Sequence, residues 1–250
     1  MTEHIVVTDE GAVRTVRINR PEKKNALTLE MYQRMTKALH DGDQSDAVRC
    51  IVVAGIPGAF TAGNDIGDFA KAATGGIPWD GAALSFLDVL AHCRKPIVAA
   101  VGGIAVGIGT TLLFHCDHVV MASDATLSTP FLKLALIPEA ASTMLAPLRM
   151  GYARAFALLA MGRPLSAAEA KEAGLVNAVV PAADVDAVAV GAAREIAALP
   201  PHALSVTRGL MRSNIDEVAK RMAAEGAHFS ELLQSEEART AFAAFFARKK

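Results

Sequence analysis

The sequence has only three cysteines among its 250 residues, and no two of them are close together. Cys50, Cys93 and Cys116 each lie in an apolar stretch and form no Cys-x-x-Cys pair. Disulfide frameworks and thiolate metal sites need organised cysteines, so the spacing argues against both. We therefore expect three buried, reduced side chains in a cytoplasmic protein without a metal site.

The sequence also lacks a long apolar run and an excess of charge of either sign. No uninterrupted apolar run reaches the roughly 18 residues of a membrane span, and the N-terminus "MTEHIVVTDEGAV" is polar and acidic. The net charge is −1, whereas proteins that bind nucleic acids or membrane surfaces usually carry a basic face. We expect a protein that binds neither nucleic acid nor membrane.

Apolar residues make up 52% of the chain, which is enough to bury a sizeable core. In the first half, short β-branched runs alternate with helical patterns. "HIVVTDE" and "AVRTVRIN" are spaced like a hairpin, while "VRCIVVAG" and "KPIVAAV" are apolar on both faces, as in buried strands. Thr28 is a suitable N-cap for an amphipathic helix over 29–40. The pattern predicts an α/β fold with crossover connections.

The second half of the chain has mostly helical spacing. We expect helix over 140–161 with an interruption near Pro147, and a capping box formed by Ser166 and Glu169. "VNAVVP" predicts one more strand, and helices follow from residue 182 to the end. The apolar faces of the last helices pack either on another subunit or on the chain's own core, and both possibilities are open.

Two stretches place glycines directly after a predicted buried strand: "AVGGIAVGIGTTLLFHCD" over 100–117 and "AFTAGNDIGDF" over 59–69. Glycine lets the backbone approach a ligand closely, and two such turns can aim two N–H donors at one developing oxyanion. The first stretch continues neither as a Walker loop nor as a dinucleotide-binding motif. The alternatives are tight strand–helix packing for the first stretch and an ordinary turn capped by Asp65 for the second.

Five stretches occur in the order and spacing of one known family: "NRPEKKNALT", "FTAGNDIGDF", "AVGGIAVGIGTTLLFHCD", "LSTPFLKLALIPEAAS" and "MGRPLSAAEAKEAGLVNAVV". Over nearly the whole chain, the sequence resembles the crotonase (enoyl-CoA hydratase/isomerase) superfamily. The resemblance implies an α/β fold in which a spiral of ββα units, here residues 1–196, precedes a C-terminal helical region for oligomerisation, residues 197–250. It also implies a homotrimer or hexamer that binds acyl-CoA thioesters and needs no cofactor besides the coenzyme A of its substrate.

The resemblance assigns an oxyanion hole to the backbone N–H groups of Asn64 and Ile108, which hold the enolate of the thioester. The family has a glycine at the place of Ile108, so the isoleucine side chain narrows the space there. Lys24 is the candidate phosphate partner, or alternatively a solvated loop lysine. Trp79 either lines the acyl pocket or packs in the core. The contacts with coenzyme A or the acyl group are assigned to Lys24, Ala26, Ala62, Asp65, Ile66, Trp79 and Phe131.

Two glutamates carry out hydration in this superfamily, and Thr111 and Phe131 occupy their positions here. The remaining carboxylate is Glu139, whose surroundings in "PFLKLALIPEAAS" resemble the peroxisomal-type Δ3,Δ2-enoyl-CoA isomerases. That resemblance implies an isomerase in which Glu139 takes a proton from C2 of a 3-enoyl-CoA and returns it to C4. We expect an apolar wall of Phe131, Leu136 and Ile137 to raise the pKa of Glu139 toward neutrality.

Other interpretations are open at this point. Glu139 is alternatively an acid at the start of a helix beginning at Ala140, where the helix dipole favours the anion. The protein alternatively catalyses another crotonase reaction, such as hydration, hydrolysis, dehalogenation or decarboxylation, or uses the fold without catalysis. His115, Cys116 and Asp117 are consecutive and point in different directions on a helix, so we interpret them as structural.

Overall fold

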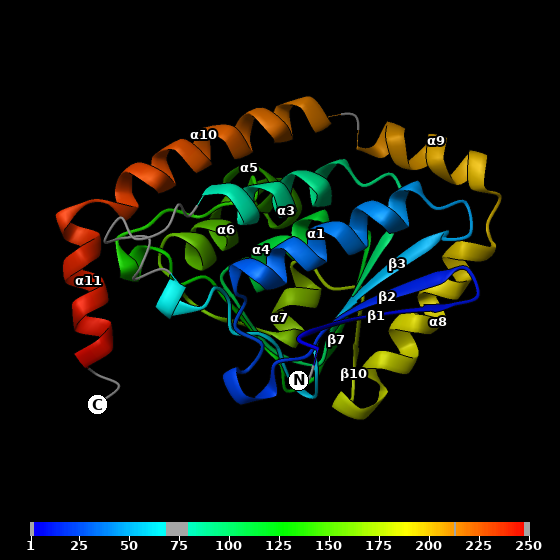
Figure 1. Ribbon diagram of the computed structural model, residues 1–250, viewed down its shortest axis with the longest axis horizontal. Coiled ribbons are helices and arrows are strands. Elements are labelled where there is room, and N and C mark those ends of the chain that lie inside the picture. The colour runs from blue at the N-terminus through cyan, green and yellow to red at the C-terminus, as the bar shows by residue number, and fades with distance from the viewer. Residues whose placement is uncertain (1–2, 69–79, 213, 248–250) are drawn as a thin grey trace.

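The chain forms two β-sheets, and Figure 1 shows the labelled strands of the larger one between the helices of residues 29–44 and 185–198. The computed structural model describes residues 3–68, 80–212 and 214–247. The larger sheet has the order β1-β2-β3-β5-β7-β10, and the smaller sheet has the order β4-β6-β8-β9. The strands are β1 (Ile5–Glu10), β2 (Val13–Ile18), β3 (Cys50–Ala54), β4 (Gly58–Thr61), β5 (Ile97–Val101), β6 (Gly103–Val106), β7 (His118–Ala122), β8 (Thr126–Ser128), β9 (Leu165–Ser166) and β10 (Ala178–Val180).

The helices connect these strands along the chain and follow the last of them. They are α1 (Leu29–Gln44), α3 (Asp80–His92), α4 (Ile108–Thr111), α5 (Ser142–Met150), α6 (Tyr152–Leu159), α7 (Ala167–Glu172), α8 (Val185–Ala198), α9 (Pro201–Met211), α10 (Ile215–Leu233) and α11 (Glu236–Ala247). Short 3-10 helices lie at Pro21–Lys23, Leu112–His115, Leu132–Leu134 and Ala182–Asp184. The predicted N-cap Thr28 accepts a hydrogen bond from the Met31 N–H, and the Ser166–Glu169 capping box forms.

The larger sheet confirms the strand predictions of the first half. β1 and β2 form an antiparallel hairpin that turns at Gly11, where φ is +58°. The other neighbouring strands pair in parallel. Every residue of β3 and β5 is buried. The helix α8 packs against both strands. Burial on both faces is the reason these strands are continuously apolar.

A repeated step along the chain links the two sheets. β3 leads into β4, β5 into β6, and β7 into β8, so the three central strands of the larger sheet that lie between β2 and β10 are each followed by a strand of the smaller one. α3 follows the first pair and α4 the second, which matches the expected spiral of ββα units. A Cβ on Gly103 would lie 2.0 Å from the carbonyl carbon of Gly58, so only glycine lets β4 and β6 approach here. Tight packing therefore accounts for part of the glycine-rich stretch.

Two predictions on the helices after Glu139 are wrong. Pro147 lies inside α5, and the interruption comes at Gly151, whose φ of +76° turns the chain between α5 and α6. Proline removes one helical N–H donor, whereas the left-handed glycine redirects the backbone. The helix also begins at Ser142 and not at Ala140, because Ala140 and Ala141 have φ values of +62° and +53°.

The described C-terminal helices pack partly on their own chain. Residues of α10 and α11 form an apolar cluster with the segment before Glu139: Phe131, Leu136, Phe229, Leu233, Ala238 and Phe242. α9 instead leaves Val206, Leu210 and Met211 exposed. The division at residues 196 and 197 and the role of the second part in oligomerisation stay predictions.

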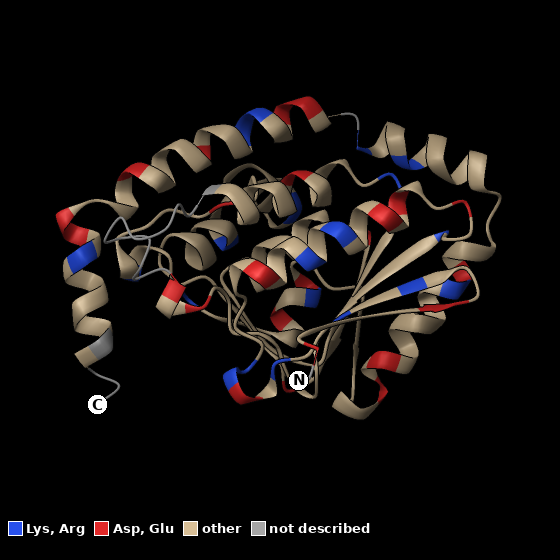
Figure 2. Cartoon of the chain, viewed as in Figure 1, with Lys and Arg blue, Asp and Glu red and all other residues tan. Residues whose placement is uncertain are grey.

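Both α1 and α10 carry side chains of either charge (Figure 2). This mixture agrees with the near-zero net charge of the sequence. Within the described residues, no helix is both long enough and apolar enough to cross a membrane.

Asn25 ties the loop between β2 and α1 to the smaller sheet. It is fully buried, and its side-chain amide donates to the carbonyl groups of Ile18, Ala59 and Phe60 at 3.0 Å each. Its Oδ1 accepts from the Arg20 N–H at 2.7 Å. Its φ is +59°, a conformation that asparagine tolerates better than most residues. This one side chain thus fixes the position of the loop that contains Lys24.

Replacing Asn25 should destabilise the protein. In Asn25→Ala the three buried carbonyl groups lose their donor, which should lower the free energy of unfolding by about 3 kcal/mol. Urea denaturation measures this change. The control is Asn214→Ala, because Asn214 is exposed and makes no side-chain capping bond. Equal stability of the two variants would contradict the role of Asn25.

Candidate active site

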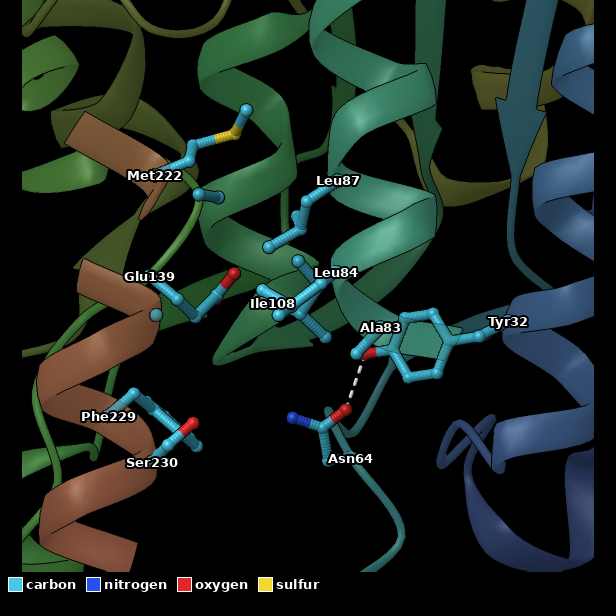
Figure 3. Close-up of a pocket in the computed structure, with 12 residues that line it drawn as sticks. Tyr32, Asn64, Ala83, Leu84, Leu87, Ile108, Glu139, Met222, Phe229 and Ser230 are labelled. Atoms are coloured by element: carbon cyan, nitrogen blue, oxygen red, sulfur yellow. Dashed lines mark hydrogen bonds between the residues drawn. The ribbon is translucent and has the colours of Figure 1, made fainter. Parts of the chain in front are cut away.

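One pocket brings together the three residues predicted to carry the chemistry. The space between its lining residues, open solvent included, is about 500 Å³, and Figure 3 shows side chains from several elements that converge on it. Asn64, Ile108 and Glu139 all line it, although they come from three separate loops of the spiral. The lining consists of Tyr32, Asn64, Ala83, Leu84, Leu87, Ile108, Glu139, Ala140, Met222, Gly226, Phe229 and Ser230.

The backbone N–H of Ile108 lies at the start of α4. Gly107, with a φ of +57°, turns the chain from β6 into this helix. The Gly107 carbonyl accepts from the N–H groups of Thr110 and Thr111 at 2.8 and 3.0 Å, which fixes the turn. The first N–H groups of a helix have no partner within the helix, so the Ile108 N–H is available to a ligand.

The backbone N–H of Asn64 is placed by a parallel bridge with Leu27. The Leu27 N–H donates to the Gly63 carbonyl, and the Leu27 carbonyl accepts from the Asp65 N–H, both at 2.8 Å. In a parallel bridge the residue between those two groups directs its own N–H away from the partner strand. The Asn64 N–H is therefore not used in the bridge with Leu27. Like the Ile108 N–H, it is a backbone donor available to a ligand.

The carboxyl group of Glu139 is buried and has one hydrogen-bond partner. Its Oε1 accepts from the Thr111 hydroxyl at 2.6 Å, and its Oε2 is buried without a partner among the described residues. Burial raises the pKa of Glu139 from its ordinary value of 4.5 to about 8. The Thr111 hydrogen bond opposes this shift, and the negative charge of Glu225 adds to it. The predicted direction of the shift is confirmed.

The apolar surroundings differ from those we expected. Besides Ile108 of α4, the large apolar side chains that line the pocket with Glu139 come from α3 and α10: Leu84, Leu87, Met222 and Phe229. Phe131, Leu136 and Ile137 belong instead to the cluster formed with α10 and α11, and none of them lines this pocket. The ring of Phe131 lies behind the Gly107 turn, 3.8 Å from where a Cβ on that glycine would be.

Glu139 does not cap the helix that follows it. The N–H groups of Ala141 and Thr143, at the start of α5, donate to Glu225. Glu139 contributes only its backbone carbonyl, which accepts from the N–H and the hydroxyl of Ser142. The alternative in which Glu139 is a helix-start acid is therefore wrong.

Sequence reasoning missed two polar partners in the site. The sequence pattern marks Thr111 only as the residue at the position of a hydratase glutamate, yet its hydroxyl donates to Glu139. Tyr32, which is buried and follows the apolar pattern of α1, donates its hydroxyl hydrogen to Oδ1 of Asn64 (Figure 3). Burial raises the pKa of Tyr32 well above 10, so the hydroxyl keeps its proton and can act as this donor.

The two loops assigned to coenzyme A lie side by side. The Ala62 N–H donates to the Lys24 carbonyl at 2.9 Å, and the Lys24 side chain is exposed. The Asp65 carboxylate pairs with Arg20 at 2.7 Å and accepts from the Gly67 N–H at 2.9 Å. Burial opposes ionisation of Asp65, but these hydrogen bonds hold its pKa below the usual range. The capping interpretation of Asp65 is confirmed.

The other assigned contact residues are placed as follows. Ala26 and Ile66 are partly exposed in these same two loops. Trp79 lies outside the described residues. The roles of these residues in binding stay predictions.

His115, Cys116 and Asp117 have structural partners. The His115 Nε2 contacts the Ala140 carbonyl at 2.8 Å, and Asp117 accepts from the Ile97 N–H and from Arg208, each at 2.8 Å. All three cysteines are free and buried, and burial raises the pKa of each thiol to about 12. Within the described part of the chain, no group of three His, Cys, Asp or Glu residues is arranged to hold a metal ion.

The comparison with known families agrees with this geometry. The model of the family described as enoyl-CoA hydratase/isomerase matches residues 8–250. The chain belongs to the enoyl-CoA hydratase/isomerase family. It is therefore an enzyme of the crotonase superfamily, whose substrates are acyl-CoA thioesters, and the fold expected from the sequence is confirmed.

Relatives in this family carry the names of different reactions. The chain is 37% identical to enoyl-CoA delta isomerase 2 of Rattus norvegicus over 85% of its length, and it spans about half of that protein (55%). It is 33% identical to a probable enoyl-CoA hydratase of Rhizobium meliloti (strain 1021), covering 99% of this chain and 96% of that one. The solved structure of Pseudomonas aeruginosa OdaA has a TM-score of 0.93 at 40% identity, with 98% of this chain and 99% of that one covered.

The raised pKa of Glu139 predicts how stability depends on pH. Glutamic acid ionises near 4.5 in the unfolded chain and at about 8 in the folded protein. The stability contributed by the protonated group is therefore full below pH 4.5 and is lost as the pH rises through 8. Glu139→Gln removes this loss, so the variant should be more stable than the wild type by about 4 kcal/mol at pH 8 and equally stable at pH 4.5.

Urea denaturation at several pH values between 4.5 and 8 tests this prediction. Glu231→Gln is the control, because Glu231 is exposed on α10. A constant difference between Glu139→Gln and the wild type at every pH would contradict the buried, protonated state of Glu139.

Proposed function

We propose that this enzyme moves the double bond of a 3-enoyl-CoA to the 2-position, with Glu139 as the single acid and base. One observation carries the proposal: among the described residues that line the pocket, Glu139 is the only carboxylic acid. The pocket is otherwise largely apolar, which suits an acyl chain.

The proposed reaction begins when the thioester oxygen lies between the N–H groups of Asn64 and Ile108. Two such donors stabilise the negative charge that develops on that oxygen. Glu139 then takes the proton from C2, and the electrons of the broken C–H bond form a dienolate. The same proton is delivered from Glu139 to C4, which leaves the double bond between C2 and C3. A pKa of about 8 lets the group act both as base and as acid near neutral pH.

The partners of Glu139 support isomerisation over hydration. Adding water needs one group to activate the water and another to supply a proton to carbon. Thr111, at one position where the hydratases have a glutamate, donates its hydroxyl hydrogen to Glu139. Phe131, at the other position, is buried in an apolar cluster. The Oε2 of Glu139, which has no hydrogen-bond partner in the described part of the chain, is the oxygen that we assign to the substrate proton.

The rest of the substrate is assigned to the two adjacent loops. We propose that segments 23–26 and 62–66 bind coenzyme A, with the exposed Lys24 as a phosphate partner. No cofactor besides the coenzyme A of the substrate takes part in this proposal.

We also propose a homotrimer or hexamer in the cytoplasm. Exposed apolar side chains on α5, α6 and α9 support assembly: Leu148, Tyr152, Phe156, Leu210 and Met211. The location rests on composition alone.

Hydration is the second candidate, because the Rhizobium meliloti relative that matches nearly the whole chain is named a probable hydratase. Assays with a 3-enoyl-CoA and a 2-enoyl-CoA separate the two. We expect conversion of the 3-enoyl-CoA without hydration of the 2-enoyl-CoA, and Glu139→Gln should lower the isomerase kcat about 1,000-fold. Glu231→Gln should leave it unchanged. Hydration that survives in Glu139→Gln would reject the proposal.

Thr111 predicts a change in the pH profile. Its hydrogen bond lowers the pKa of Glu139, so Thr111→Val should raise that pKa by about one unit. The rising limb of the plot of kcat/KM against pH should then move to higher pH. At pH 7 the loss in kcat/KM should be about tenfold. Thr126→Val is the control, because Thr126 is exposed on β8. An unchanged limb would mean that Thr111 does not tune Glu139.

A further inference from the structure

The second peptide group after Glu139 is unusually constrained. It joins Ala140 and Ala141, which are both buried and both left-handed, with φ values of +62° and +53°. A left-handed conformation costs an alanine about 1 kcal/mol or more, and it persists only where the surroundings enforce it. The contacts of this peptide therefore decide where the chain places Glu139.

The carbonyl end of the peptide is held by His115. The Nε2 of His115 lies 2.8 Å from the Ala140 oxygen, and a carbonyl can only accept, so Nε2 carries the hydrogen. Burial lowers the pKa of His115 to about 4, with the charges of Arg212 and Arg149 acting in the same direction. The ring is therefore neutral near pH 7 and acts as a fixed donor.

The N–H end of the same peptide is held by Glu225, from the middle of α10. Its Oε2 accepts from the Ala141 N–H at 2.6 Å. Its Oε1 accepts from the Thr143 N–H at 3.1 Å and from the Thr143 hydroxyl at 2.5 Å. Arg221 donates to the Thr143 oxygen at 3.1 Å, which directs the Thr143 hydrogen toward Glu225. Burial raises the pKa of Glu225, whereas these hydrogen bonds and the charge of Arg221 oppose the rise, and both oxygens act as acceptors, as in the ionised form.

We propose that His115 and Glu225 are positioning residues for Glu139. They hold the two opposite ends of the Ala140–Ala141 peptide and thereby fix the Glu139 carboxyl in the pocket. The inference rests on the proposed function, in which Glu139 moves the proton. It also links α10 to the chemistry, because Met222 and Phe229 of this helix line the pocket on the same side as Glu139 (Figure 3).

Glu225 has a second, electrostatic effect on Glu139. Its negative charge raises the pKa of Glu139, in addition to the effect of burial. The other groups that face the pair are the neutral hydroxyls of Thr111, Tyr32 and Thr143 and the cation of Arg221. Removing the charge of Glu225 should therefore make Glu139 a stronger acid.

Glu225→Gln tests both effects. A glutamine has only one oxygen to turn toward the donors, so its NH₂ group faces the N–H of either Ala141 or Thr143 and the hold on the turn is weakened. We expect kcat for the 3-enoyl-CoA to fall about 30-fold with KM within about twofold of the wild type, and the rising limb of the kcat/KM profile to move to lower pH. Glu231→Gln, on the exposed face of α10, should change neither quantity. An unchanged limb and an unchanged kcat would overturn the proposal.

A pair of substitutions at His115 provides the second test and serves if Glu225→Gln does not fold. The amide nitrogen of glutamine reaches the place of Nε2, so His115→Gln should keep most of the kcat. His115→Met fills similar space without a donor and should lose about tenfold in kcat at unchanged KM. Equal kcat values in the two folded variants would overturn the role of the hydrogen bond.

A titration independent of the reaction separates this inference from the proposed function. The ¹³C resonance of the Glu139 carboxyl, assigned by its absence in Glu139→Gln, reports the pKa of the group directly. We expect a lower pKa in Glu225→Gln than in the wild type. A wild type inactive on 3-enoyl-CoA would reject the proposed function, whereas an unshifted carboxyl titration would reject the coupling to Glu225.

Discussion

Glu139 is a carboxyl group buried in apolar surroundings, with no cation paired to it among the described residues. Ionising such a group costs several kcal/mol more than in water, and its pKa rises to about 8 as a result. A group of this kind weakens the folded protein near neutral pH. A buried carboxyl group of this kind suits a pocket in which it exchanges a proton with a ligand. The other groups of the site are arranged around this proton exchange.

The fold supplies what this carboxyl group needs. The repeated step from the larger sheet to the smaller one ends in turns, and two of these turns place the N–H groups of Asn64 and Ile108 at the same pocket. The loop after β8 brings Glu139 to that pocket, where the Thr111 hydroxyl meets its Oε1. α10 then crosses over the site, adds apolar lining and contributes Glu225 to the turn that follows Glu139. The chemistry thus depends on elements from both halves of the chain.

The parts of the structure that depend on local sequence were predictable. Continuous apolar runs gave the buried strands, and capping side chains gave the starts of α1 and α7. Partners distant in sequence were not, such as Thr111 with Glu139, 28 residues apart, and Ala141 with Glu225, 84 residues apart. Ala140 and Ala141 look like helix formers, and only the contacts made by the folded chain impose their left-handed conformation. The apolar lining was misassigned for the same reason, because α10 is remote from Glu139 in the sequence.

Transfer of a labelled hydrogen tests the central claim most directly. A 3-enoyl-CoA carrying deuterium at C2 is converted in a single turnover in ordinary water, and the product is analysed by mass spectrometry and NMR. If Glu139 alone moves the proton within a buried pocket, a substantial part of the deuterium should reappear at C4 of the product. Complete replacement of the label by solvent hydrogen would mean that water or a second acid protonates C4, and it would contradict the single-residue mechanism.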